Sequence, residues 1–212
     1  MNKSPDSPEQ VIHIIDDDEA LRDSLVWLLE SNDHCARSYA SGEDFLAVLA
    51  DDMAGCVLLD VRMPGMSGLE LFELLRARGF GLPVIFITGH GDVPMAVEAL
   101  KRGAYDFIEK PFGDRDVLDL IEAALAHEGK EREQRTLRTE VSRRLSELTQ
   151  REHEVLQLIL TGKLNKQIAD VLGISIKTVE VHRARVMEKM GVRSLAELVQ
   201  NVMTVDPSIL RS

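Results

Sequence analysis

The sequence predicts two domains, an open doubly wound α/β domain on a parallel sheet and a small all-helical domain after it. Short apolar runs that alternate with helix-length segments predict the first domain, and a C-terminal part with helical periodicity and no strand-like run predicts the second. Charge divides the chain in the same way. Residues 1–130 hold 11 Lys/Arg and 25 Asp/Glu, a net charge of −14, whereas residues 131–212 hold 14 and 11, a net charge of +3.

The composition narrows the class of protein. The chain has 212 residues, of which 44% are hydrophobic, enough to bury two modest cores. Its net charge of −11 argues against nucleic-acid binding when taken alone, but the positive C-terminal part removes that objection. Cys35 and Cys56 are too few for a disulfide framework or a zinc site, and no apolar run nears the roughly 20 residues of a membrane helix. We therefore expect a cytoplasmic protein with no membrane contact.

Strand-length apolar runs define the first domain, expected at residues 10–126 after a disordered start, 1–9, that is rich in Ser, Pro and Asp. Segments with apolar residues at helical spacing separate the runs. This alternation implies parallel strands joined by right-handed helical crossovers, with the sheet buried on both faces. The runs are Val11–Ile15, Cys56–Leu59, Val84–Ile87 and a weaker one at Tyr105–Ile108.

The rest of the chain has a helical pattern. Residues 127–146 are rich in charged helix formers and poor in large apolar residues, which predicts a solvated linker helix. A helical domain is expected at residues 147–205, before a tail at 206–212. Thr149 and Glu152 have the spacing of a capping box, so that a helix is expected to begin after Thr149.

Two further helices form a predicted helix-turn-helix. The first covers Asn165–Leu172 and ends at Gly173, and Ser175 can cap a second that runs to about Met190. Two helices joined by a short turn are typical of DNA-binding domains, in which the second helix enters the major groove.

The second of these helices has one apolar face and one mixed face. Val179, Val186 and Met190 share a face, which should pack in the core. The opposite side carries small apolar and polar groups suited to the floor of a major groove, although His182 can equally be a structural histidine. Residues that open the two helices are candidates for phosphate contacts. The candidate DNA contacts are Lys166, Lys177, Thr178, Glu180, Val181, His182, Arg185 and Lys189, the last toward a flank of the helix.

Polar side chains follow the strand-length runs of the first domain. Because ligands of open α/β sheets bind beyond the carboxyl ends of the strands, Asp16, Asp17, Asp60, Thr88 and Lys110 should surround one crevice. Crowded carboxylates repel one another, and Mg²⁺ can neutralise them while it takes only one or two carboxylates and keeps sites for phosphate oxygens. Asp60 can then act as a nucleophile that forms an acyl phosphate, with Lys110 offsetting charge and Thr88 donating its hydroxyl.

Four segments occur in order around this crevice: Ile14–Asp17, Leu59–Gly68, Ile87–Gly91 and Phe107–Phe112. Together they resemble the receiver domain of bacterial response regulators. The resemblance implies a five-stranded, flavodoxin-like parallel sheet, in which Asp60 takes a phosphoryl group from a phosphohistidine of a sensor histidine kinase. It gives Asp18 no role. The Mg²⁺ ligands that it implies are Asp16, Asp17, Asp60 and the backbone carbonyl of Arg62.

The same resemblance implies a switch. Thr88 is expected to move toward the phosphoryl group, beside Lys110, and Phe107 to swing into the space that Thr88 leaves. The new state can favour dimerisation, through a surface that includes the helix around 95–101. Phe107 can otherwise be an ordinary core aromatic.

Three C-terminal segments, Leu148–Glu152, Asn165–Ala169 and Ile174–Arg183, resemble the LuxR-type DNA-binding domain. With the receiver, nearly the whole chain is similar to the FixJ-like response regulators. This resemblance implies that the unphosphorylated receiver restrains the DNA-binding domain, and that phosphorylation permits a homodimer on paired half-sites of promoter DNA. It implies RNA polymerase as a further partner and favours activation of transcription.

Two alternatives remain open. Hydrolases of the haloacid dehalogenase type also use an aspartate nucleophile and Mg²⁺ at a parallel sheet, but resemblance to them would require an aspartate where this chain has Arg62. The second alternative is a receiver that is never phosphorylated, in a phosphorylation-independent DNA-binding regulator or in a protein-binding module. The joint presence of Asp17, Asp60, Thr88 and Lys110 disfavours it.

Overall fold

The structure, a computed structural model, describes residues 9–89 and 93–206. The chain divides into two compact units, Met1–Lys130 and Glu131–Ser212, called here the N-terminal and C-terminal units. Most of the start and of the tail that the sequence predicts to be irregular lies outside the described residues, as do His90 and Gly91 of one receiver-like segment.

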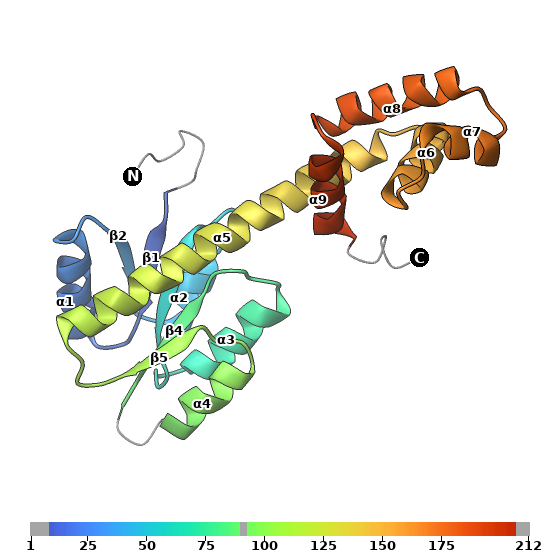
Figure 1. Cartoon of the computed structure of the whole chain (residues 1–212). Helices are drawn as coiled ribbons and strands as arrows, with labels where there is room; N and C mark the ends of the chain where they lie inside the picture. The colour runs from blue at the N-terminus through green and yellow to red at the C-terminus, as the bar shows by residue number, and fades with distance from the viewer. Residues whose placement is uncertain (1–8, 90–92, 207–212) are drawn as a thin grey trace. The chain divides into compact units, whose positions relative to one another are not determined.

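A five-stranded parallel sheet forms the centre of the N-terminal unit, in the order β2-β1-β3-β4-β5 (Figure 1). Helices cover both faces, so the predicted doubly wound α/β fold is confirmed. The strand order reverses between β1 and β3, and in such sheets the ligand crevice lies at this point, beyond the carboxyl ends of the strands. The strands are β1 Val11–Ile15, β2 Cys35–Tyr39, β3 Gly55–Asp60, β4 Val84–Thr88 and β5 Asp106–Glu109.

Two hydrophobic clusters lie on opposite faces of this sheet. Alternate strand residues supply them, so that Ile14 of β1 packs with residues of the first and fifth helices and Ile15 with residues of the second, third and fourth. Both side chains are fully buried, as expected for a parallel sheet covered on both faces. The helices are α1 Glu19–Glu30, α2 Gly42–Ala47, α3 Gly68–Ala77, α4 Val93–Lys101 and the first part of α5 Asp114–Ser146.

Strand β2 has no counterpart among the apolar runs of the sequence. It lies at an edge of the sheet, pairs with β1 alone, and exposes Arg37 and Ser38. Because one side of an edge strand faces solvent, it needs no continuous apolar run, and its sequence therefore carries little signal. Only the resemblance to receiver domains implied a fifth strand.

Helix α3 begins directly against the end of β3. Ser67 caps the helix and forms a reciprocal capping box with Glu70: the Glu70 amide donates to Ser67 Oγ at 3.3 Å, and the Ser67 amide donates to Glu70 Oε2 at 2.9 Å. The next residue, Gly68, lies so close to Asp60 that a Cβ atom would stand 2.0 Å from the Asp60 carbonyl oxygen. Only glycine allows this approach, which fixes the loop between Asp60 and α3.

Helix α5 belongs to both units. Its first turns bury Val117 and Ile121 in the N-terminal unit, and its last turns bury Val141 in the C-terminal unit. The segment expected as a linker helix, 127–146, is therefore continuous with the last helix of the N-terminal unit. Between the two buried stretches the helix is almost entirely polar and includes Gly129.

Four more helices follow α5 among the described residues, and the N-caps predicted for α6 and α8 are confirmed. Thr149 and Glu152 form the expected capping box, and the Thr178 amide donates to the hydroxyl of Ser175 at 3.1 Å. The expected apolar face of α8 is fully buried. The helices are α6 Gln150–Leu160, α7 Asn165–Leu172, α8 Ile176–Met190 and α9 Leu195–Val205.

The C-terminal end of α8 is tied to α5 and α6 by two basic side chains. Lys189 Nζ donates to Glu152 Oε2 at 2.7 Å and to the Glu147 carbonyl at 3.0 Å, and Arg144 Nη1 donates to the Met190 carbonyl at 2.6 Å. Glu152 is only 2% exposed. The hydrogen bond from Lys189, with that from the Thr149 amide, lowers the pKa of Glu152 to about 2. These contacts fix the position of α8 within its own unit.

Gly68→Ala should lower the free energy of unfolding of the N-terminal unit by about 1–3 kcal/mol, because the new methyl group collides with backbone rather than with a side chain that can turn away. Hydrogen exchange of the backbone amides of the buried strands β1 and β3 measures the free energy of unfolding of this unit. Gly129→Ala is the matched control. No atom lies within 4 Å of the Cβ position there, and the change should raise helix stability by about 0.5–1 kcal/mol. Equal stability of the two variants would contradict the assignment.

Lys189→Met should lower the free energy of unfolding of the C-terminal unit by about 1–2 kcal/mol at neutral pH, because Glu152 then stays buried without its charged partner. The folded pKa of Glu152, about 2, lies below its ordinary value of 4.5. The stabilisation is therefore complete above pH 4.5 and is lost as the pH falls toward 2.

An NMR titration of the Glu152 carboxyl group tests this account, and the pKa should rise toward its ordinary value in Lys189→Met. Lys166→Met removes the same charge from an exposed position of α7 and should leave both the pKa and the stability unchanged. An unshifted Glu152 in the Lys189 variant would show that the ion pair is not the cause.

Candidate phosphoacceptor site and DNA interface

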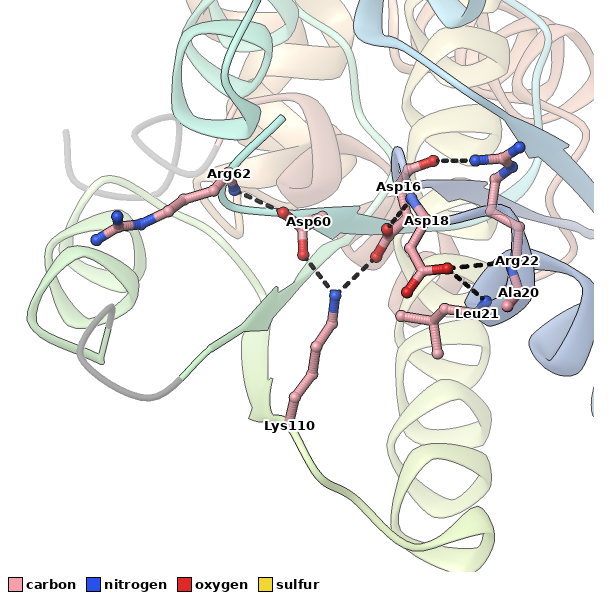
Figure 2. Close-up of polar contacts among 8 residues, drawn as sticks. All are labelled: Asp16, Asp18, Ala20, Leu21, Arg22, Asp60, Arg62 and Lys110. Atoms are coloured by element: carbon pink, nitrogen blue, oxygen red, sulfur yellow. Dashed lines mark hydrogen bonds and ion pairs between the residues drawn. The ribbon is translucent and has the colours of Figure 1, made fainter. Parts of the chain in front are cut away.

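Three charged side chains meet at the carboxyl ends of the central strands. Asp16 follows β1, Asp60 ends β3, and Lys110 follows β5. Lys110 Nζ donates to Asp60 Oδ1 at 2.7 Å and to Asp16 Oδ2 at 2.9 Å, so that a single ammonium group bridges two carboxylates (Figure 2). Asp16 is 1% exposed and Asp60 7%. The crevice that the sequence predicts therefore contains a buried pair of like charges with one counter-charge.

Pairing between the strands brings these groups together. Asp60 lies opposite Ile87 in the β3–β4 register, and the Lys110 amide donates to the Thr88 carbonyl at 2.8 Å, which extends the pairing of β4 and β5 by one residue. The Lys110–Pro111 peptide bond is cis. The Lys110 backbone is held beside the end of β4 by its hydrogen bond to the Thr88 carbonyl. Its side chain can therefore reach Asp60, which ends β3, two strands away from β5.

The second carboxylate oxygen of Asp60 is held by the backbone. The Arg62 amide donates to Asp60 Oδ2 at 2.6 Å, while the Arg62 side chain is exposed and points away from Asp60 (Figure 2). Each oxygen of the Asp60 carboxylate therefore has one hydrogen-bond donor, an ammonium group on one side and an amide on the other. This arrangement fixes the orientation of the carboxylate without neutralising the whole pair.

Burial and neighbouring charges shift the pKa values of the site. Burial raises the pKa of Asp60, Lys110 opposes this rise through its hydrogen bond and charge, and Asp16 adds to it. Burial alone would lower the pKa of Lys110, but its hydrogen bonds with Asp60 and Asp16 raise it above the ordinary value. Lys110 thus remains a cation. Since one cation compensates two carboxylates only in part, the site favours a further positive charge.

The other residues predicted for the site lie nearby but outside this cluster. Asp17 is exposed and forms no hydrogen bond or ion pair with the described residues. Thr88 is fully buried at the end of β4, and its hydroxyl donates to the Gly89 carbonyl at 3.3 Å. Phe107 of β5 is half-buried and packs on the cluster that contains Phe86. The structure therefore brings Asp16, Asp60 and Lys110 together in one cluster. Asp17, Thr88 and Phe107 lie beside that cluster, and among the described residues their side chains form no hydrogen bond with it.

The donor set is compatible with a magnesium ion. Among residues 9–89 and 93–206, no three Asp, Glu, His or Cys side chains converge as a ready-made metal cluster, and Asp17 is exposed. Mg²⁺ does not need such a cluster, since it typically takes one or two carboxylates and keeps several waters. Asp16 and Asp60, with the exposed Asp17 beside them, supply oxygen ligands of the right chemistry.

Two contacts of this site have no counterpart in the predicted roles. Arg22 of α1 donates from Nη1 to the Asp16 carbonyl at 2.7 Å, and the Asp18 amide donates to Asp16 Oδ1 at 2.8 Å. The signal for Asp18 was present in the sequence, since an aspartate directly before an amphipathic helix is a typical N-cap. No comparable pattern marks an arginine that bonds to a backbone carbonyl.

The predicted recognition helix α8 exposes most of the side chains expected to contact DNA. His182 is half-buried, and its Nδ1 has no hydrogen-bond partner in the part of the chain that the structure describes. Thr178 is exposed, and its hydroxyl lies 2.8 Å from Ser175 Oγ. The exposed candidates are Lys166, Lys177, Thr178, Glu180, Val181 and Arg185.

Lys189 differs from the other candidates. Its ammonium group is engaged with Glu152 and the Glu147 carbonyl, so a DNA contact would have to replace hydrogen bonds to a buried carboxylate. The structure favours a role for Lys189 in holding α8, in place of the flanking DNA contact expected from its position. The sequence alone could not separate these roles, because both require a basic residue in the last turn of the helix.

Comparisons with known proteins agree with this arrangement. Residues 12–122 match the family of response regulator receiver domains, and residues 146–202 match the luxR family of bacterial regulatory proteins. The C4-dicarboxylate transport transcriptional regulatory protein DctR of Rhodobacter capsulatus is 52% identical over 194 residues, which cover 89% of this chain and 97% of DctR. The transcriptional regulatory protein FixJ of Azorhizobium caulinodans is 49% identical, over 91% of this chain and 92% of FixJ.

Solved structures support the same relationship. The response regulator StyR superposes with a TM-score of 0.83 at 44% sequence identity, over 92% of this chain and 98% of StyR. Receiver domains typically use Mg²⁺ for phosphotransfer. None of the helices within residues 9–89 and 93–206 has the length and apolar character needed to span a membrane. The chain belongs to the FixJ-like two-component response regulators, which join a receiver domain to a LuxR-type DNA-binding domain that regulates transcription.

Proposed function

We propose that Asp60 accepts a phosphoryl group from a sensor histidine kinase, and that this modification controls binding of promoter DNA by the C-terminal unit. The observation that carries the proposal is the bridge from Lys110 to both Asp16 and Asp60. A carboxylate that is buried, oriented and beside a fixed ammonium group has the surroundings that an aspartate nucleophile needs.

The reaction transfers the phosphoryl group from nitrogen to oxygen. A carboxylate oxygen of Asp60 bonds to phosphorus as the bond from phosphorus to the kinase histidine breaks, and the electron pair of that bond returns to the histidine ring. The Lys110 ammonium group offsets the added negative charge, and the Arg62 amide keeps the carboxylate oriented. A bound Mg²⁺ would supply further charge neutralisation, with Asp16, Asp17, Asp60 and the Arg62 carbonyl as its ligands.

The switch that follows involves residues beside the cluster. The Thr88 hydroxyl donates to the Gly89 carbonyl at 3.3 Å, which is long for a hydrogen bond between oxygen atoms. A phosphoryl oxygen can replace this weak acceptor. Movement of Thr88 would leave space for Phe107, which is half-buried on the adjacent strand. We propose that the altered surface, including α4, supports homodimerisation, which places two C-terminal units on paired half-sites.

On DNA, the exposed face of α8 enters the major groove. Lys177, Glu180, Val181 and Arg185 are exposed there, and His182 is half-buried beside them. Lys166 and Thr178, near the starts of α7 and α8, are the proposed contacts to DNA phosphates. We propose that the bound dimer contacts RNA polymerase and activates transcription, in the cytoplasm, where promoter DNA and the kinase domain are available. A receiver that works without phosphorylation is the alternative outcome of the tests below.

Asp60→Asn should abolish labelling by acetyl phosphate and Mg²⁺, together with the gain in DNA affinity that labelling gives to the native protein. The amide cannot form the acyl phosphate, although it fills the same space. Mass spectrometry of the labelled protein locates the phosphoryl group. Asp52→Asn, at an exposed position before β3, should be labelled like the native chain. Persistent labelling of the Asp60 variant would place the acceptor elsewhere.

Lys177→Ala and Arg185→Ala should each weaken specific DNA binding by about 1–3 kcal/mol without any change in labelling, because they remove exposed side chains from α8 and touch nothing in the receiver. Lys166→Ala should weaken binding to all sequences similarly and reduce the salt dependence by about one ion. Fluorescence anisotropy with a selected duplex measures both effects. Lys130→Ala removes an equal charge outside the C-terminal unit, and an equal loss of affinity in that variant would contradict the proposed interface.

A further inference from the structure

The three consecutive aspartates after β1 have different surroundings. Asp16 is buried and bonded to Lys110, and Asp17 is exposed without a partner among the described residues. Asp18 is the N-cap of α1: its Oδ1 accepts the amides of Ala20 at 3.0 Å and Leu21 at 3.3 Å. The Asp18 side chain therefore belongs to the helix, and its backbone is fixed by the start of that helix.

Helix α1 in turn holds Asp16 at two points. The Asp18 amide donates to Asp16 Oδ1 at 2.8 Å, and Arg22, one turn further along α1, donates from Nη1 to the Asp16 carbonyl at 2.7 Å (Figure 2). Since Lys110 donates to Asp16 Oδ2, both oxygens of this carboxylate and its backbone carbonyl are held from outside. Asp17 lies between the two tied residues, so the same bonds restrict its backbone.

We infer that Asp18 and Arg22 are positioning residues of the phosphoacceptor site, which hold Asp16 and the backbone at Asp17 in the orientation that Mg²⁺ binding needs. The inference rests on the proposed function. Neither residue is a ligand in this account. Asp18 acts through its cap on α1, and Arg22 through the carbonyl that it holds. Groups that orient metal ligands from outside typically change metal affinity by about 10–100-fold when removed.

The Asp18 carboxylate can be tested as a cap and as a ligand separately. Asp18→Ala removes the cap and should weaken Mg²⁺ binding by about tenfold. Asp18→Asn keeps a side-chain oxygen that caps helices as well as aspartate does, so affinity should return to within about twofold of the native value. Isothermal titration calorimetry of the full chain with MgCl₂ alone measures the affinity without any phosphotransfer.

Two control variants separate this role from loss of stability or of charge. Ser41→Ala removes the N-cap of α2, where Ser41 Oγ accepts the Asp44 amide at 3.1 Å, and should destabilise the fold by a similar amount without changing Mg²⁺ affinity. Asp23→Ala removes an exposed charge from the same helix as Asp18, and its effect should stay within about twofold because exposed charges are screened by salt.

The role of Arg22 is tested by one variant and one control variant. Arg22→Met keeps most of the length of the side chain but removes the donor to the Asp16 carbonyl, and should weaken Mg²⁺ binding by about tenfold. Arg115→Met removes the same charge from an exposed position of α5 and should have no such effect. Removal of a positive charge near a cation site would by itself strengthen binding, so a weaker affinity in Arg22→Met indicates lost positioning.

The outcomes distinguish the inference from the proposed function. Mg²⁺ affinity that is equal in Asp18→Ala and the native chain overturns the inference, and so does an Asp18→Asn variant as weak as Asp18→Ala, which would make Asp18 a ligand. A native chain that binds no Mg²⁺ and is not labelled at Asp60 overturns the proposed function itself. Native binding with a tenfold loss in Asp18→Ala, and recovery in Asp18→Asn, supports both.

Discussion

The N-terminal unit is organised around two carboxylates that share one ammonium group. Asp16 follows β1 and Asp60 ends the neighbouring strand β3 in the middle of the sheet, where water is largely excluded and like charges repel strongly. Lys110 compensates one of the two charges, and the strand order brings it to them across β4. The incomplete compensation makes the site sensitive to any cation or anion that enters it. A phosphoryl group on Asp60, as proposed, would add negative charge to a pair of carboxylates that is already compensated only in part.

In the C-terminal unit, the contacts hold α8 in place and leave one of its faces exposed. The apolar face of α8 is fully buried, and its last turn is fixed by hydrogen bonds from Lys189 and Arg144. The exposed α8 side chains proposed to contact DNA run from the first turn to Arg185, and the helix amides and Lys177 provide positive potential at the start of the helix. The contacts that fix α8 lie in its last turn, so among the described residues they leave the proposed DNA-binding side chains free of structural hydrogen bonds to other helices.

Much of this arrangement could be predicted from the sequence, and the limits have physical causes. Buried strands and helix caps have strong local signals, which is why β1, β3 and β4 and the caps at Thr149 and Ser175 were predicted correctly. Edge strand β2 was not found from its residues, because it is half-exposed. Contacts that join residues far apart in the sequence, such as the one between Lys189 and Glu152, left no local pattern. Sheet topology was enough to group the predicted site residues around one crevice. It could not predict that the three aspartates after β1 have different surroundings.

The polar middle of α5 has an evolutionary consequence. Among the described residues, no side chain between Leu125 and Val141 belongs to a hydrophobic cluster of either unit. Glu128 is still buried and accepts a hydrogen bond from Gln10, so recombination of genes beyond Gly129 would leave both interiors intact, and one receiver could be joined to a foreign effector domain without repacking. An isolated helical stretch of this length is only marginally stable in water, so its order depends on the packed turns of α5 at either end. The helix is thus a natural junction at which the parts of such proteins can be exchanged.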